Sequence, residues 1–158
     1  MIDTPNLNVV LFEPGIALNT GNIGRTCAAT GSSLHLIRPF GFRLNEKEIK
    51  RAGMDYWERI DVHEYINYRD FLERNPGARI FYATTKTKKL YTEARFAPGD
   101  FIMFGNESRG IRQEILEENE DMCIRIPMLP DERCLNLANS AAVVLYEALR
   151  QCGFPRLA

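Results

Sequence analysis

Short apolar runs recur along the chain, and polar stretches of helical length separate them. Each run has four to six residues and is rich in valine, isoleucine, leucine or phenylalanine, as is typical of strands buried on both faces of a parallel sheet. Five segments fit this description: 7–12 (LNVVLF), 33–37 (SLHLI), 79–84 (RIFYAT), 101–104 (FIMF) and 123–126 (CIRI). The stretch 60–62 is ambiguous and is a sixth candidate strand.

The segments between these runs carry helix signals. Thr20 or Asn22 is placed to cap a helix that runs to about residue 30, where Gly31 suits a left-handed C-terminal position. Three further helices are expected, at 46–52, where the spacing fits a capping box, at 68–75 and at 111–118. Strands that alternate with helices in this way predict an α/β layer structure with a mainly parallel sheet.

The stretch 124–146 (IRIPMLPDERCLNLANSAAVVLY) joins the last strand to the last helix through a polar loop. Pro127 and Pro130 restrict that loop, and helical spacing begins at Leu135. Two apolar rows follow, one with Leu135, Ala138, Ala142, Leu145 and Leu149, the other with Leu137, Ala141, Val144 and Ala148. A helix that is apolar on two faces needs cover from two directions. We expect the sheet to cover one face and a second subunit the other.

Length and composition narrow the class of protein. At 158 residues the chain fits a single domain, 1–158, and an apolar content of 45% is ordinary for a globular protein. The net charge of −1 excludes nothing, because cations can still gather on one face. The four cysteines form no CxxC pair and there are only two histidines, so we expect reduced thiols and no metal. The N-terminal segment lacks a signal-peptide pattern and no run is long enough to span a membrane, which predicts a cytoplasmic protein.

Three loops after predicted strands are candidates for chemistry, since ligands of parallel sheets bind beyond the carboxyl ends of the strands. The segment 19–25 (NTGNIGR) is either a phosphate or substrate loop or a plain turn with an asparagine cap. The segment 104–110 (FGNESRG) is either a tight ligand-binding loop or a turn with an ion pair between Glu107 and Arg109, which its spacing alone favours. The loop 127–136 is either a site, which the buried strand and the polar strip of the helix favour, or a proline-rich connection in which Asp131 or Asn136 helps the helix to start. None of them matches GxGxxG or GxxxxGK[ST].

Isolated residues carry weaker signals. His35 lies in an apolar strand and His63 has no obvious partner, so neither is assigned a role. Tyr56 and Trp57 are more typical of a core than of base stacking. The basic run 86–89 is either a solvated loop, which is its default interpretation, or a phosphate contact, because it follows a strand. Lys88 and Lys89 are its candidates for binding a substrate phosphate.

Together the three motifs resemble the SPOUT superfamily of RNA methyltransferases. NTGNIGR, FGNESRG and IRIPM with LNLANSAAVVLYE occur in the family's order, and the resemblance covers nearly the whole chain. EPG at 13–15, RAGMDYW at 51–57 and IRIPM also match the family of small tRNA 2'-O-ribose methyltransferases that act on wobble cytidine or uridine. The resemblance implies a parallel sheet with a C-terminal trefoil knot, S-adenosylmethionine as cofactor, S-adenosylhomocysteine as product, tRNA as substrate, and a homodimer with the active site at the subunit interface.

The resemblance also implies roles for single residues. Cofactor-binding positions carried over from the family are Ala83, Thr84, Gly105, Glu107, Gly110, Ile126, Met128, Cys134 and Leu135. Asn19, Arg25 and Asn136 match its polar, catalytic positions on the substrate side. Cys134 stands where relatives commonly carry serine, and a thiol is a weak hydrogen-bonding group.

For the implied reaction the protein mainly has to align the ribose 2'-oxygen with the methyl group, because the sulfonium already activates that methyl group. A guanidinium is almost never deprotonated in a protein, so we expect Arg25 to bind the adjacent phosphate and stabilise the developing alkoxide, and no proton acceptor is assigned. Two alternatives are kept. One is a noncatalytic RNA-binding dimer of the same fold, to which Cys134 gives some weight. The other is a nucleotide- or flavin-binding oxidoreductase, although the chain has no dinucleotide fingerprint.

Overall fold

A parallel six-stranded sheet forms the centre of the protein in the computed structural model, which describes residues 4–45, 47, 51 and 55–158. The strands are β1 (Asn8–Phe12), β2 (Ser33–Ile37), β3 (Val62–Tyr65), β4 (Ile80–Ala83), β5 (Phe101–Phe104) and β6 (Cys123–Ile124). The helices are α1 (Ala17–Thr30), α3 (Tyr68–Arg74), α4 (Gln113–Glu118) and α5 (Leu137–Gln151), with 3-10 turns η1 (Trp57–Arg59), η2 (Tyr91–Glu93) and η3 (Glu120–Met122). The strand order is β3-β2-β1-β5-β4-β6, and every pairing is parallel.

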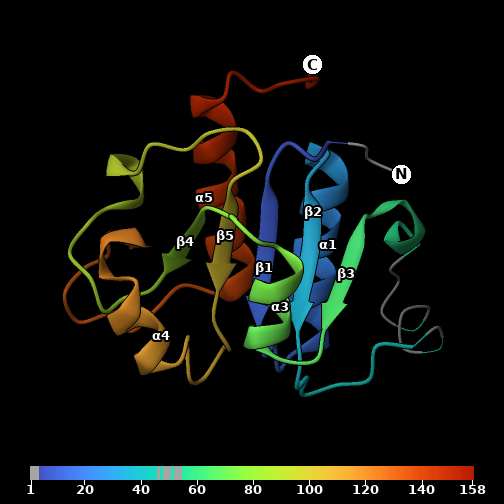
Figure 1. The fold of residues 1–158 in the computed structure, drawn as a ribbon, viewed down its shortest axis with the longest axis horizontal. Coiled ribbons are helices and arrows are strands. Elements are labelled where there is room, and N and C mark those ends of the chain that lie inside the picture. Colours follow the sequence, from blue (N-terminus) through green and yellow to red (C-terminus); the bar gives the residue numbers. More distant parts are fainter. Residues whose placement is uncertain (1–3, 46, 48–50, 52–54) are drawn as a thin grey trace.

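Helices cover both faces of this sheet. Figure 1 shows α3 and α4 in front of the strands and α1 and α5 behind them. Along β1, Val9 and Leu11 belong to the core shared with α1 and α5, whereas Val10 and Phe12 belong to the core shared with α3 and α4. All five residues of β1 are buried, which explains why apolar residues follow one another without alternation from Val9 to Phe12.

The predicted strands are confirmed, with small changes at their ends. β2 and β5 have the predicted bounds, and β1 and β4 are shorter than predicted by one and two residues. The ambiguous stretch 60–62 corresponds to β3, which begins only at Val62 and runs on to Tyr65. β6 keeps two of its four predicted residues, and Arg125 continues the parallel pairing as an isolated bridge to Leu90. The fold class of an α/β protein with a parallel sheet is therefore correct.

The predicted starts of α1, α4 and α5 need correction, and α4 begins at Gln113, two residues after its predicted start. α1 begins at Ala17, so Thr20 and Asn22 lie inside the helix and neither caps it. Gly31 does end α1 in the left-handed conformation, with φ of 64°. Asn67 caps α3 through the amide of Asp70. The helix expected at 46–52 falls largely outside the described residues.

The last helix starts two residues later than predicted and buries parts of both apolar rows. Asn136 is its N-cap and accepts a hydrogen bond from the Asn139 amide at 3.1 Å. The buried residues of α5 are Ala141, Val144, Leu145, Ala148 and Leu149. Val143 and Tyr146 remain 39% and 47% exposed on the outer side. Among the helices of the described chain, none has the length and apolar character needed to cross a membrane.

Candidate active site

A cavity of about 770 Å³ opens at the carboxyl edge of the sheet, at the ends of β4, β5 and β6. This is the edge at which parallel α/β sheets bind ligands, because the loops that leave the strands converge there. The walls come from segments that are distant in sequence: residues 16 and 19, 83–86 and 91, 104–111, and selected positions between 124 and 144. The volume lies within the roughly 300–1,000 Å³ typical of small-molecule sites.

The loop after β5 is closed on itself through Asn106. The Asn106 carbonyl accepts a hydrogen bond from the Gly110 amide at 2.8 Å, and its side-chain oxygen accepts from the amides of Ser108 and Arg109 at 2.9 and 3.1 Å. A Cβ on Gly105 would lie 2.3 Å from the carbonyl carbon of Gly110. The loop therefore requires glycine at position 105, and it presents backbone to the cavity where other residues would present side chains.

Glu107 connects this loop to the start of α1. Its carboxylate accepts hydrogen bonds from the amides of Gly15 at 2.8 Å and Ile16 at 3.0 Å, and from the side-chain amide of Asn19 at 3.1 Å. Ile16 is the N-cap of α1 and has no side-chain cap of its own. Glu107 therefore supplies, from 91 positions away, an acceptor and a negative charge that a helix N-terminus favours.

This contact excludes the ion pair that spacing favoured for the segment 104–110. The ion pair expected from spacing, between Glu107 and Arg109, does not form, because Glu107 is occupied by α1. Arg109 instead lies 3.6 Å from the carboxylate of Glu13, which also contacts Arg112 at 3.2 Å. The segment 19–25 is likewise not a loop, since it lies within α1.

Asn19 carries the connection onward to the last helix. Its side-chain oxygen accepts a hydrogen bond from the side-chain amide of Asn136 at 3.1 Å, while the side-chain oxygen of Asn136 caps α5. A chain of polar contacts thus runs from Glu107 through Asn19 to Asn136 along one wall of the cavity. These contacts hold the starts of α1 and α5 and the loop after β5 in one arrangement.

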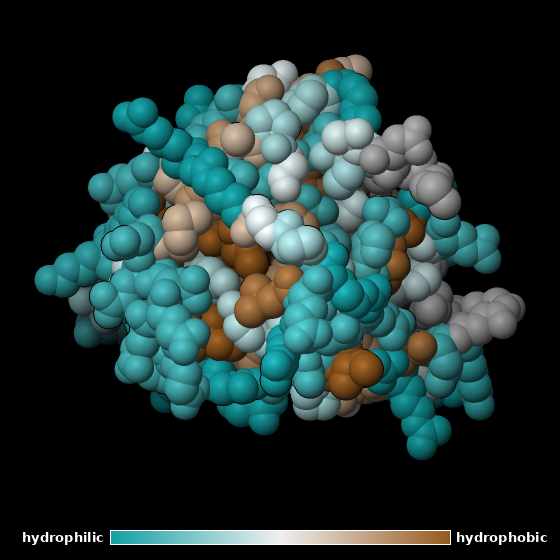
Figure 2. All heavy atoms as spheres, viewed as in Figure 1, coloured by the Kyte–Doolittle hydropathy of each residue, from teal (hydrophilic) through white to brown (hydrophobic). Residues whose placement is uncertain are grey.

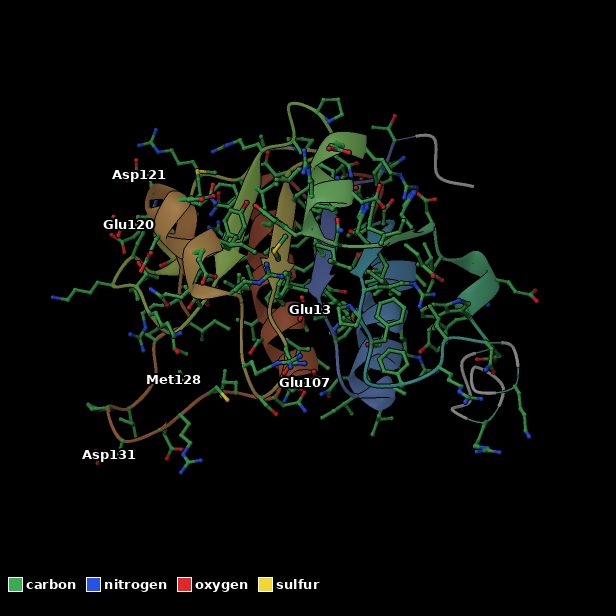
Figure 3. All side chains as sticks on the ribbon, turned by 60° about the horizontal axis from the view of Figure 1, so that its bottom comes forward. Glu13, Glu107, Glu120, Asp121, Met128 and Asp131 are labelled. Carbon is green, nitrogen blue, oxygen red and sulfur yellow. The ribbon has the colours of Figure 1, made fainter. Side chains whose placement is uncertain are left out.

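The structure gathers most of the predicted site residues around this cavity. Lining it are Ala83, Thr84, Gly105, Glu107, Gly110, Ile126, Met128, Cys134 and Leu135 from the expected cofactor set, with Asn19 and Asn136 from the catalytic set. Figure 3 shows Glu107 and Glu13 near the lower end of the sheet, and Met128 on the loop that extends outward past Asp131. Cys134 is exposed on this loop.

Arg25, Lys88 and Lys89 lie outside the cavity. Arg25 is exposed on α1, where its guanidinium carbon lies 5.5 Å from the centroid of the Tyr56 ring. Lys88 is exposed, and the Lys89 ammonium lies 3.5 Å from the carbonyl of Asp121. The chain by itself therefore does not bring these three cations to the reacting centre.

Several cations at the cavity were not predicted as site residues. Lys86, Arg109, Arg125 and Arg133 line it. Arg125 is held by the carbonyls of Thr85 and Thr87, each 3.3 Å from its Nη1 atom. Their position in the sequence could have identified two of them, because Lys86 and Arg125 both follow the end of a strand that opens onto this edge.

The two histidines form a separate polar cluster away from the cavity lining. His35 is 3% exposed, and its ring nitrogens lie 2.8 Å from the Tyr65 hydroxyl and 2.9 Å from the Asn8 side-chain oxygen. Burial, reinforced by the neighbouring His63, lowers the pKa of His35 to about 3. His63 contacts Asp61 at 3.0 Å. Within the described residues, no group of three or more histidine, cysteine or acidic side chains is arranged to hold a metal ion.

Comparison with known proteins places this arrangement among RNA methyltransferases. Residues 6–146 match the model of the SpoU rRNA Methylase family. A tRNA (cytidine(34)-2'-O)-methyltransferase of Escherichia coli (strain K12) is 47% identical over 150 residues, which cover 94% of this chain and 96% of that enzyme.

Solved structures agree with the sequence match. A structure concerned with 2-OH methylation of C/U34 on tRNA superposes with a TM-score of 0.86 at 45% identity, covering 92% of this chain and 95% of that one. An AdoMet-bound rRNA methyltransferase from Sinorhizobium meliloti superposes with a TM-score of 0.80 at 25% identity, covering 94% of this chain and 57% of that one.

Proposed function

Because the chain belongs to the SpoU rRNA methylase family, we propose that it is an S-adenosylmethionine-dependent tRNA 2'-O-ribose methyltransferase that acts on the wobble cytidine or uridine. The observation that carries this proposal is the 47% identity, over nearly the full length of both chains, to a tRNA (cytidine(34)-2'-O)-methyltransferase. The family match over residues 6–146 includes all three segments of the site. Neither the oxidoreductase nor the noncatalytic RNA binder is favoured by any of these relatives.

The residues of the cavity fit S-adenosylmethionine. Ile126, Leu135 and the peptide edges of Gly105 and Gly110 offer apolar and backbone surface to a flat adenine ring. Lys86 and the arginines add positive charge, which suits the carboxylate of a methionine moiety. When bound, this cofactor supplies a sulfonium-activated methyl group and leaves as S-adenosylhomocysteine.

The remaining work of the protein is to align and stabilise. Asn19 and Asn136 are fixed to each other at 3.1 Å and face the cavity, so they can orient the ribose beside the methyl group. The ribose 2'-oxygen gains the methyl carbon as the bond from that carbon to sulfur breaks, and its proton passes to an acceptor that is not assigned. Negative charge develops on the oxygen as the proton leaves. In this proposal Arg25 keeps its own proton, binds the adjacent phosphate and stabilises the developing alkoxide.

Arg25 reaches a reacting centre most simply in a homodimer. It lies on the exposed side of α1, outside the cavity of its own chain, so we place it at the cavity of a second copy. Support comes from the apolar side chains exposed on α1 and α5: Leu18 is 64% exposed, and Val143 and Tyr146 lie on the neighbouring helix. Hydrophilic side chains cover most of the opposite face, which carries α3 and α4 (Figure 2). The α1 and α5 side is therefore the proposed subunit interface.

The path of the chain after β6 supports the proposed C-terminal trefoil knot. β6 lies at one edge of the sheet, yet α5 packs beside α1, so residues 125–136 must return past β4 and β5. Arg125 pairs with Leu90 as an isolated bridge and bonds the carbonyls of Thr85 and Thr87 on the way. The returning segment is thus held against the loop 85–90, through which the knot would thread.

The other parts of the proposal concern the substrate and the setting. We assign Lys88 and Lys89 to tRNA phosphates, and treat residues 1–158 as one catalytic domain that works in the cytoplasm, where tRNA is modified. Replacing both lysines by alanine should weaken tRNA binding and flatten its salt dependence, with nearly unchanged cofactor affinity, since each phosphate contact adds to the salt slope. Equal losses in both affinities would contradict the assignment.

Transfer of a radiolabelled methyl group from S-adenosylmethionine to tRNA tests the central proposal. RNA should be taken from cells that lack this protein, and mapping should place the new 2'-O-methyl group at position 34. Arg25→Ala should abolish most of the transfer, and full activity of that variant would refute the role of Arg25. Failure of the wild-type protein on both modified and unmodified tRNA would favour the RNA binder. Calorimetric binding of NAD or FMN, without binding of S-adenosylmethionine, would favour the oxidoreductase.

A further inference from the structure

Arg25 rests on the ring of Tyr56, a residue with no assigned role. The 5.5 Å between the guanidinium carbon and the ring centroid is within the range of a cation–π contact. Arg25 is exposed, whereas Tyr56 is only 6% exposed. A long and flexible side chain is therefore supported by a ring that is itself fixed.

The Tyr56 ring is fixed to the same turn of α1 that carries Arg25. Its hydroxyl donates a hydrogen bond to the carbonyl of Gly21. In regular helical geometry the Arg25 amide donates to that same carbonyl, four residues back. The ring and the arginine thus share one anchor, and a shift of the ring relative to the helix would break it.

Two residues that follow Tyr56 pack closely on α1 at Gly24, next to Arg25. A Cβ on Gly24 would lie 3.1 Å from the Trp57 ring and 3.0 Å from the Cδ1 atom of Ile60. Both side chains pack against the core that contains α1. The absence of a side chain at Gly24 lets η1 lie flush on α1, next to Arg25.

We propose that Tyr56 is a positioning residue, which directs the Arg25 guanidinium outward from α1 toward the substrate phosphate before RNA binds. This inference rests on the proposed function, in which Arg25 meets that phosphate. A free arginine side chain loses considerable rotamer entropy when it is immobilised. Holding it in advance transfers that cost from catalysis to folding. The ring, more than the hydroxyl, is the part that acts on Arg25.

Two substitutions separate the ring from the hydroxyl. Tyr56→Leu should lower kcat for tRNA about tenfold with unchanged affinity for S-adenosylmethionine, because the cation–π contact and the preset direction are lost together. Tyr56→Phe keeps the ring and should stay within about twofold of the wild type in kcat, although it loses the bond to Gly21. Equal kcat losses in the two variants, or no loss in Tyr56→Leu, would overturn the proposal.

Two further variants, Tyr65→Leu as a matched control and Gly24→Ala as a second way to displace the Tyr56 ring, separate an effect on positioning from an effect on stability. Tyr65 holds Arg74 in a similar contact, at 4.5 Å, and neither residue lines the cavity. Tyr65→Leu should lower the melting temperature and leave kcat nearly unchanged. Gly24→Ala should push η1 and the Tyr56 ring away from α1 by a few tenths of an ångström, and it should therefore lower kcat. Because alanine is a better helix former than glycine, α1 should still fold. An unchanged kcat in Gly24→Ala would count against the proposal.

The decisive measurement is a double-mutant cycle between positions 25 and 56. In the Arg25→Ala background, Tyr56→Leu should cause no further loss of kcat, because its effect passes through Arg25. A further tenfold loss in that background would show a purely structural role and overturn the inference. Failure of the wild-type protein to methylate tRNA would reject the proposed function itself. An active wild type with additive substitutions would reject only the role of Tyr56.

Discussion

Replacing Glu107 by glutamine keeps the size of the side chain and removes one of its two acceptor oxygens. In the native loop the two oxygens accept from different amides of the α1 N-terminus, Gly15 at 2.8 Å and Ile16 at 3.0 Å. Glutamine offers one oxygen and one NH2 group. One of the two backbone amides must then face another donor, so Glu107→Gln should loosen the start of α1.

The size of the loss follows from these contacts. Loss of a helix N-cap costs about 1 kcal/mol, and loss of a negative charge at a helix N-terminus adds about 0.3–1 kcal/mol. The bond to Ile16 is exposed to solvent, where water can replace a lost partner. We therefore expect the free energy of unfolding to fall by about 1–2 kcal/mol. If the binding free energy of S-adenosylmethionine falls by the same amount, the affinity decreases by at most about 30-fold.

Urea unfolding with the free chain measures the first quantity and calorimetry with S-adenosylmethionine the second. Glu117→Gln is the control, because Glu117 is exposed on α4 and contacts the exposed side chain of Gln113 at 3.3 Å. The control should change the free energy of unfolding by less than about 0.5 kcal/mol. If Glu107→Gln unfolds at the same urea concentration as the wild type, then Glu107 does not cap α1 in the way described here.

Two other predictions concern the loop after β5 and the buried histidine. Gly105→Ala places a Cβ 2.3 Å from backbone, so it should lower the free energy of unfolding by about 1–3 kcal/mol and remove most of the affinity for S-adenosylmethionine. The control Gly77→Ala has open space but φ of 77°, so it should lower the free energy of unfolding by about 1 kcal/mol and leave binding intact. Equal cofactor affinities of the two variants in isothermal titration would contradict this. The pKa of His35 is lowered from 6.5 to about 3 in the folded state, so the unfolded state binds the proton first as the pH falls. The free energy of unfolding, measured in urea titrations, should therefore be constant above pH 6.5 and decrease by up to about 1.4 kcal/mol per pH unit between 6.5 and 3. His35→Gln should flatten this slope. Identical pH profiles for the variant and the wild type would disprove the prediction.

Local sequence predicts the strands well because their burial is continuous. β2 and β5 have the predicted bounds, since each is an apolar run between polar or turn residues. The start of α1 could not be found in the same way. Its acceptor is Glu107, 91 positions from Ile16, so no capping residue precedes the helix in sequence. β6 is shorter than predicted, and Arg125 pairs beyond it with Leu90, a contact that no local pattern shows.

The candidate site was predictable where residue types define a loop. Gly105 and Gly110 mark a tight turn, and the structure places both at the cavity. Local pattern could not show that Glu107 contacts α1 in preference to Arg109. It also could not show that Arg25 faces away from the cavity of its own chain, since that depends on how α1 packs beside α5.

The polar contacts that run from Glu107 through Asn19 to Asn136 also set when the cavity can exist. They join residues that are 88 and 117 positions apart, and the second pair needs the start of the last helix. At a synthesis rate of about 5–20 residues per second, the N-terminal strands emerge seconds before α5 does. A nascent chain therefore lacks the complete cavity. If the cavity binds the cofactor as proposed, only a chain that has completed α5 binds it.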